Sequence, residues 1–582
     1  MAWIFGGHVA KPGQKVLQAG LSDCDSDGTN THYISQHLEP AGTERSTEHA
    51  ESRQTLKWSL ILVRLANCKN APRPLPMPYE KQPRFPFAIV SALLVGLVLL
   101  FHVLTLRAGL DWDGDYALYL MQARTIVENT TYTTPYLFNP DNAINPSLYP
   151  PGLPLLLAPI YSIFGNDLEA MKWAGLAALA GWLLAFAYIA RNFVASWLAL
   201  AATLLMGIHP FIWELKNSIY SELPFLLWTY ATLLLANRLI EGEASPGDTR
   251  WTMLGLTLTL ALAYLTRTAA IVLFPAIFLT SLYRTRRIVT PALFALAGGA
   301  VLAMLVLSRY PADSATYVNY FDQFSPWGIL QSVRAYELSL ETLVQGHPLS
   351  SRLLGFTETA FLLSLIATGF IARVRNRISV FEVFLAGYAA LLLLYPIRWE
   401  ADRYSLPIWP LLLAYGLKGA QIVGIALRSE RWRLFPPALV SIALFGSYSY
   451  AYAGKDFTPF ANSVTDPLSQ ELFRAIRSRV PENGVVLARK PTIIGLYTSR
   501  QSSTWPRNFE NDTDFWTWAR SINARYLVQD LYQFGDGEYD PNDSLDRFIK
   551  SNQQALTELF ANEWFKVYTF ELPLINHDAG QP

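Results

Sequence analysis

The sequence is poor in charge, in cysteine and in closely spaced histidine, and each shortage excludes a class of protein. Charged residues are 16% of the 582 positions, against about 25% in soluble domains. The net charge is +0, so no global basic field indicates a nucleic-acid partner. Cys24 and Cys68 are the only cysteines and predict no disulfide framework. The 8 histidines are scattered, which argues against a zinc site.

Nucleotide-binding motifs are missing as well. The sequence contains neither a P-loop nor a G-x-G-x-x-G turn after a strand, so nothing indicates a soluble nucleotide substrate. No cofactor and no metal site follow from the residue pattern, although carboxylates alone could hold a divalent cation.

Long apolar runs are what the sequence has instead. Hydrophobic residues make up 51% of it, and about 20 consecutive apolar residues can cross a bilayer as a helix. The runs predict an α-helical polytopic membrane protein with about 11 transmembrane helices. They cover 86–106, 170–190, 194–211, 219–240, 251–265, 267–283, 289–308, 355–373, 379–396, 405–427 and 434–453.

One further run, 152–165, is too short to span and is interrupted by two prolines. We predict that it is an interfacial or re-entrant helix. Short basic loops face the cytoplasm, and "RTRR", "RVRNR" and "RSERWR" all fall inside if the N-terminus is cytoplasmic. The acidic loop 107–151 then lies outside. We therefore expect a multi-pass protein of the cell (inner or plasma) membrane.

Composition divides the chain into segments. Residues 1–80 are polar and aperiodic, which predicts a disordered tail, with Met77 as a candidate true start. The transmembrane domain covers 86–453, including a first outer loop at 107–165 that carries interfacial helices. After a linker at 454–466, helix-spaced and strand-like runs predict a small extracytoplasmic α/β domain over 467–582.

The predicted topology gathers ionisable residues at the outer membrane surface. Asp113 and Asp115 lie in the first loop, Glu222 begins the run 219–240, and Arg267 and Arg403 lie at outer ends of other runs. Charges at membrane depth are costly, so such a cluster is a functional hypothesis.

Each of these charges also has a structural alternative. Asp111, Arg398 and Glu400 can be ordinary solvated loop residues, and Glu222 can form a structural salt bridge with Arg267.

A carboxylate facing an arginine at the lipid–water boundary suits one type of chemistry. The carboxylate can deprotonate an acceptor hydroxyl or amine. The arginine can hold a phosphate through two parallel hydrogen bonds and stabilise it as it leaves. Together they favour attack on a sugar carbon whose leaving group is a lipid-linked phosphate.

Five motifs in this order resemble the GT-C glycosyltransferases: "WDGDYALYLMQAR", "YPPGLPLLLAPIYSIFG", "SELPFLLW", "LTRTAAIVLFPA" and "DRYSLPIWPLLLAYG". The similarity is greatest to the bacterial protein O-mannosyltransferase and aminoarabinose transferase group and covers about 86–530. It implies a polyprenyl-phosphate sugar donor and a glycolipid, glycan or protein acceptor outside the cytoplasm.

The resemblance also implies site residues. Asp113 is the expected base, with Asp115 next. This sequence has Asp-Gly-Asp where better-known members have Asp-Glu, so the choice between the two carboxylates stays open. Arg403 is the expected phosphate ligand, assisted by Arg267. The expected supporting residues are Glu222, Tyr404, Tyr149, Pro151 and Gly152.

The alternative functions are a transporter or flippase of lipid-linked sugars and a lipid-linked oligosaccharide polymerase or ligase. A transporter predicts inverted repeats and midplane charges, and a polymerase or ligase predicts a very large outer loop. The sequence shows no internal repeat, and its charges cluster at one predicted face. The loop 309–354 is only moderate in length.

Overall fold

The computed structural model describes residues 86–112, 114–134, 136–137, 148–242, 246–286, 290–312, 325–345, 352–395, 400–426, 434–506, 509, 511–531 and 544–572. The predictions made for residues 1–80, Asp113 and Arg398 lie outside these ranges. Everything described from Phe87 onwards belongs to one compact unit.

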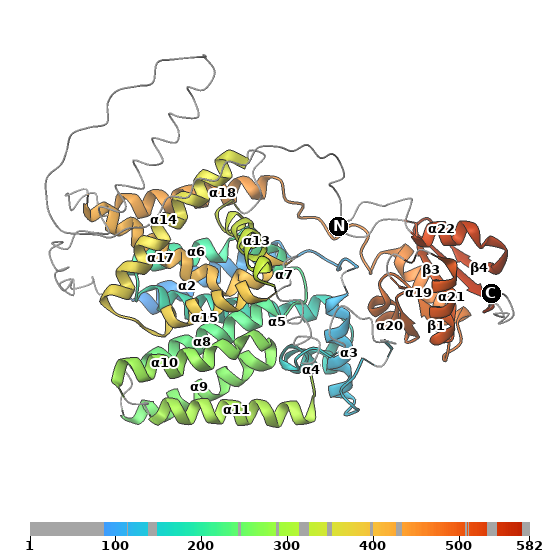
Figure 1. Ribbon diagram of the computed structural model, residues 1–582, viewed down its shortest axis with the longest axis horizontal. Helices are drawn as coiled ribbons and strands as arrows, with labels where there is room; N and C mark the ends of the chain where they lie inside the picture. The colour runs from blue at the N-terminus through green and yellow to red at the C-terminus, as the bar shows by residue number, and fades with distance from the viewer. Residues whose placement is uncertain are drawn as a thin grey trace, which may run out of the picture. The chain divides into compact units, whose positions relative to one another are not determined.

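Helices form most of the described chain (Figure 1), and each predicted apolar run overlaps one. In chain order they are α2 (Phe87–Leu104), α3 (Asp115–Val127), α4 (Gly152–Phe164), α5 (Leu168–Ala190), α6 (Ser196–Gly207), α7 (Pro210–Lys216), α8 (Glu222–Ile240), α9 (Pro246–Thr266), η1 (Thr268–Val272), α10 (Leu273–Thr285), α11 (Thr290–Arg309), α13 (Pro326–Gln345), α14 (Arg352–Asn376), α15 (Val380–Leu394), α16 (Ala401–Ser405), η3 (Leu406–Ile408), α17 (Trp409–Ala426) and α18 (Phe435–Ala453).

Among the described residues, 6 helices are long and apolar enough to cross a membrane, and the pair α6–α7, bent by 54°, would make 7. The six are α2, α5, α8, α11, the part of α14 from Thr357 onwards, and the continuous segment Ala401–Ala426. The helical membrane class is therefore confirmed, and the number of eleven spans stays a prediction. The 13-residue α4 is too short to be counted among them, as predicted for 152–165.

The outward faces of these helices are apolar. On α2, Ile89, Leu93, Leu97 and Leu100 are each more than half exposed and recur every three or four residues, so they form one stripe. A continuous apolar stripe of this kind marks a surface that contacts lipid or another protein.

Small residues bring two of the helices into close contact. An added Cβ at Gly419 of α17 would overlap the Leu365 carbonyl of α14, and one at Gly369 would overlap the Tyr415 carbonyl. Glycine allows this approach because membrane helices associate through backbone proximity and van der Waals packing.

The basic loops meet at one end of α8. Glu241, just after the helix, pairs with Arg284 at 3.1 Å and with Arg377. Arg284 begins "RTRR" and Arg377 ends "RVRNR", the basic motifs that the charge rule assigns to the cytoplasm. Glu222 begins the same helix, and its 19 residues span about 28 Å, close to the thickness of a hydrocarbon core.

The C-terminal residues form the expected α/β fold. Its elements are α19 (Pro467–Arg479), β1 (Val485–Leu487), α20 (Pro491–Thr498), β2 (Gln501–Ser503), α21 (Asp512–Ser521), β3 (Ala524–Asp530), α22 (Ser544–Ser551), η5 (Gln553–Ala555), β4 (Leu556–Ala561) and β5 (Phe565–Phe570). The described strands form a 5-stranded sheet of order β2-β1-β3-β5-β4. The β2, β1 and β3 strands are parallel, whereas β5 is antiparallel to β3 and β4.

This domain shares a hydrophobic core with the segment around α3 and α4. The Trp112 ring lies 5.6 Å from the Phe473 ring and 5.1 Å from the Phe565 ring. Leu137 forms a parallel bridge with Ser502 beside β2. The α/β domain and the acidic segment are therefore at the same end of the helical domain.

Candidate functional site

Arg403 lies at the centre of a cluster of charged side chains. Its Nε is 2.6 Å from Glu222 Oε1, its Nη1 is 2.7 Å from Glu400 Oε1, and its Nη2 is 3.3 Å from Asp115 Oδ2. Glu222 is 181 residues from Arg403 in the chain, and Asp115 is 288 residues away. The convergence that the sequence hypothesis required is therefore present in the fold.

Arg267 joins the cluster through the same carboxylate. Its Nη1 is 2.6 Å from Glu222 Oε1, so one oxygen accepts from both arginines. Glu222 is 2% exposed, and its other oxygen has no hydrogen-bond partner among the residues described. The salt bridge considered as a structural role for Glu222 is thus part of the cluster.

Helix ends place the charged groups. Asp115 and Glu222 are the first residues of α3 and α8, where unpaired backbone N–H groups favour a carboxylate. Arg267 is the extended residue, with φ −148° and ψ 131°, at which α9 ends and η1 begins. Arg403 lies in the five-residue α16 that leads through η3 into α17.

Aromatic rings lie beside both guanidinium groups. The Arg403 guanidinium carbon is 4.3 Å from the ring centre of Tyr220, and that of Arg267 is 5.5 Å from the ring centre of Tyr404. Such contacts stabilise a cation that is partly removed from water. Tyr404 was expected to support the site. Tyr220 was missed, although it comes two residues before Glu222.

Tyr149 holds the Asp115 carboxylate from the other side. Its hydroxyl donates to Asp115 Oδ1 at 3.0 Å, and its ring stacks on Tyr119 with centres 4.8 Å apart. The hydroxyl of Tyr132 donates in turn to the Tyr149 carbonyl at 2.9 Å. The "YPPG" motif therefore acts on the acidic segment through its tyrosine.

The rest of that motif sets the start of α4. Pro151 is the N-cap residue, and Gly152 is the first helical residue. A Cβ at Gly152 would lie 2.7 Å from the Leu265 carbonyl oxygen and 2.6 Å from Thr266 Oγ1. Glycine is required because α4 begins against the last turn of α9, immediately before Arg267.

The phenol of Tyr119 on α3 is buried near two carboxylates. Burial raises the pKa of Tyr119 well above its ordinary value, and the nearby charges of Asp115 and Glu222 raise it further. The phenol therefore stays protonated, and it donates to Ser221 Oγ at 3.3 Å.

The cluster is partly exposed. The side chains of Arg403, Asp115 and Arg267 are 14%, 19% and 19% exposed, and that of Glu400 is 33% exposed, whereas Glu222 is buried. These described members carry two positive and three negative charges, a net charge of 2 − 3 = −1. Within the described ranges no group of three or more His, Cys, Asp or Glu residues could hold a metal ion.

The sequence matches no protein-family model and no curated protein sequence. Solved structures do match. ArnT from Cupriavidus metallidurans bound to undecaprenyl phosphate aligns with a TM-score of 0.54 at 12% identity, over 83% of this chain and 98% of that one. The archaeal oligosaccharyltransferase AglB from Archaeoglobus fulgidus, in complex with an inhibitory peptide and a dolichol-phosphate, aligns with a TM-score of 0.50 at 14% identity, over 76% of this chain and 69% of that one. Both are GT-C glycosyltransferases.

The chain has the GT-C fold. The likeness covers 83% of this chain for ArnT and 76% for AglB, so the fold implied by the ordered motifs is confirmed.

One helix of this fold was not expected from the sequence. The region 309–354 was interpreted only as a loop, but it contains the 20-residue α13. Thr342 Oγ1 of α13 donates to Asp402 Oδ2 at 3.3 Å, and the hydroxyl of Ser339 hydrogen-bonds to that of Ser405. These bonds connect α13 to α16, the short helix that carries Arg403. Exposed and buried side chains alternate along α13, so it contains no long apolar run. A search for apolar runs therefore does not detect this helix.

Proposed function

We propose that this chain is a membrane glycosyltransferase that transfers a monosaccharide from a polyprenyl-phosphate-linked donor to an acceptor outside the cytoplasm. The observation that carries the proposal is the pair Arg403 and Arg267 on one buried carboxylate, beside the acidic start of α3. Lipid phosphates in the ArnT and AglB structures support it. The acceptor is a glycolipid, a glycan or a protein.

In this proposal Arg403 and Arg267 bind the donor phosphate and Glu222 orients both guanidinium groups. A carboxylate of the Asp113–Asp115 pair removes the proton of the acceptor hydroxyl or amine. The acceptor atom then bonds to the sugar carbon while the bond from that carbon to the phosphate oxygen breaks. The electron pair leaves with the polyprenyl phosphate, and the configuration at the sugar carbon is inverted.

Donor binding would change the partners of Arg403. Its contact with Asp115 is the longest of the three, 3.3 Å against 2.6 Å and 2.7 Å, so an entering phosphate displaces Asp115 first. Arg267 pairs with Glu222 alone among the described residues, which leaves other guanidinium donors for the phosphate. A carboxylate released from Arg403 only when the donor is bound would favour transfer over side reactions.

A transporter or flippase is the less favoured function. It predicts charges near the bilayer midplane, whereas Asp115 and Glu222 are at the first residues of their helices. The proposed enzyme is a multi-pass cell-membrane protein with eleven spans, a cytoplasmic N-terminus and an extracytoplasmic α/β domain. That orientation places the cluster on the outer side.

The test is sugar transfer by the purified protein. Labelled polyprenyl-phosphate sugars are incubated with crude cell-envelope fractions, and the labelled product identifies both substrates. Asp113→Asn and Asp115→Asn are assayed separately, and at least one should lose most of the activity. Full activity in both at normal expression would show that the base assignment is wrong.

A matched pair of arginine variants tests the phosphate site. Arg403→Met should weaken donor use far more than acceptor use. Arg373→Met is the control, because Arg373 pairs with Glu382 at 3.4 Å and lies 5.0 Å from the Phe193 ring centre, a similar environment in another part of the bundle. Equal effects of the two substitutions would indicate a structural role for Arg403.

A further inference from the structure

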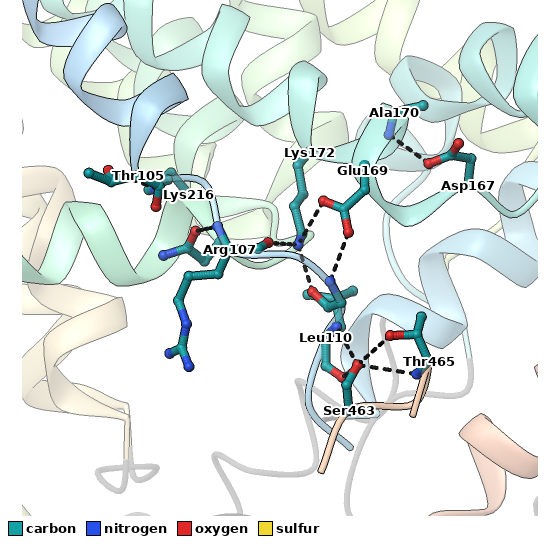
Figure 2. Close-up of polar contacts among 12 residues, drawn as sticks. Thr105, Arg107, Leu110, Asp167, Glu169, Ala170, Lys172, Lys216, Ser463 and Thr465 are labelled. Atoms are coloured by element: carbon teal, nitrogen blue, oxygen red, sulfur yellow. Dashed lines mark hydrogen bonds and ion pairs between the residues drawn. The ribbon is translucent and has the colours of Figure 1, made fainter. Parts of the chain in front are cut away.

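Lys172 is a buried lysine that the proposed chemistry does not use (Figure 2). It lies in the first turns of α5, and its side chain is 0% exposed. Nζ donates to the carbonyl oxygens of Arg107 at 2.7 Å and Gly109 at 2.6 Å, and it lies 3.4 Å from Glu169 Oε2. An ammonium is costly to bury unless its donors are satisfied, and here they bind the backbone that leads to the acidic segment.

Glu169 binds the same backbone from the same helix. Its Oε1 accepts from the Gly109 N–H at 2.8 Å. Gly109 has φ +75°, and a Cβ there would overlap the hydroxyl of Ser463. The turn therefore has one close-fitting conformation, which Lys172 and Glu169 fix from the side of α5.

The linker before the α/β domain holds the other side of this turn. Ser463 Oγ accepts from the Leu110 N–H at 3.1 Å, and the Val464 N–H donates to the Leu110 carbonyl at 3.0 Å. The Phe460 N–H donates to the Ala108 carbonyl at 3.0 Å. Figure 2 shows Lys172 and Ser463 approaching the segment around Leu110 from α5 and from the linker, respectively.

We propose that Lys172 is a positioning residue that fixes the backbone Arg107–Leu110 and thereby holds the acidic residues that follow it against Arg403. This inference rests on the proposed function. No substrate can reach the buried ammonium, so Lys172 acts only through the turn. Asp115 follows Gly109 by six residues, and Trp112, held between two rings of the α/β domain, extends the fixed segment toward it.

If Lys172 had only a general structural role, its replacement would speed hydrogen exchange equally in every peptide. Lys216 provides the matched control. It is also 0% exposed, and its ammonium donates to the His102 carbonyl at 3.1 Å and to the Thr105 carbonyl. Lys216→Met removes a buried ammonium from the end of α2. It leaves the bonds of Gly109 and Leu110 to Glu169 and Ser463 in place.

The experiment compares wild type, Lys172→Met and Lys216→Met as full-length protein in lipid nanodiscs. Amide hydrogen exchange of the peptide around 107–116 reports the turn without any substrate, because exchange follows local opening. In Lys172→Met this peptide should exchange about tenfold faster or more, while peptides from α8 and α14 keep wild-type rates. Lys216→Met should leave the 107–116 peptide at the wild-type rate.

Kinetics supply the second readout. A displacement of about 1 Å at a reacting group can cost about a hundredfold in rate, so Lys172→Met should lower kcat at least tenfold with the donor KM within about twofold. Unchanged exchange at 107–116, an equal increase in every peptide, or a wild-type kcat would each overturn the proposal. If wild type transfers no sugar, the proposed function fails, and the exchange result still decides whether Lys172 fixes the turn.

Discussion

Glu222→Gln tests whether a single buried carboxylate holds the two arginines of the cluster. Arg403 Nε and Arg267 Nη1 both lie 2.6 Å from Glu222 Oε1. A glutamine amide oxygen can accept the same two hydrogen bonds, and its NH2 group occupies the place of Oε2, which has no partner among the described residues. The substitution therefore preserves the shape and removes one negative charge.

The expected loss of stability follows from these contacts. A hydrogen bond with an ionised partner contributes about 1.5–3 kcal/mol, against about 0.5–1.5 kcal/mol for a neutral one, so two weakened bonds cost about 2 kcal/mol. Arg267 also loses its only carboxylate partner in the described part of the chain, and breaking a fully buried pair costs about 3–5 kcal/mol. Because the Arg267 side chain is 19% exposed, we expect a total of about 2–4 kcal/mol.

Unfolding of the purified protein in detergent or mixed micelles measures this loss. Glu128→Gln is the reference, because Glu128 pairs with Arg124 at 2.7 Å but is 44% exposed, and an exposed pair contributes at most about 1 kcal/mol. Polyprenyl phosphate should restore more stability to Glu222→Gln than to wild type, since its charge can replace the lost carboxylate. If Glu222→Gln is as stable as Glu128→Gln, Glu222 does not hold the arginines and the reasoning is refuted.

Three further substitutions have defined outcomes. Tyr149→Phe keeps the ring but loses the hydroxyl bound to Asp115. We expect about a tenfold lower transfer rate without loss of folded protein, and a wild-type rate would contradict this role. Gly152→Ala places a Cβ 2.7 Å from the Leu265 carbonyl oxygen and should destabilise the protein by about 1–3 kcal/mol in thermal unfolding. Gly419→Leu should yield little monodisperse protein in size-exclusion chromatography, because its Cβ overlaps the backbone of α14.

Much of the architecture could be predicted from sequence because its signals are local. In hydrocarbon every backbone polar group must be satisfied within its own segment, so an apolar run becomes a helix whatever its neighbours are. The break at Thr266 and Arg267 was located in this way, since a charge between two apolar runs marks a turn. The buried run "GVVLA" likewise identified β1.

The site could be predicted only in part. Asp115, Glu222, Arg267 and Arg403 could be chosen as candidates because charges are rare beside apolar runs. Their partnership required the fold, since Asp115 and Arg403 are separated by 288 residues. The hydrophobic pattern contains no information about which helix ends meet.

Local sequence patterns were enough to predict the class of protein, the main breaks between its helices and the charged residues that the proposed transfer uses. The fold was needed to show that one oxygen of Glu222 accepts from two arginines, that Tyr149 binds Asp115, and that the buried Lys172 donates to the turn before the acidic segment. The two differ because hydropathy and helical period are properties of neighbouring residues. Ion pairs and backbone contacts, in contrast, depend on how distant helix ends pack together.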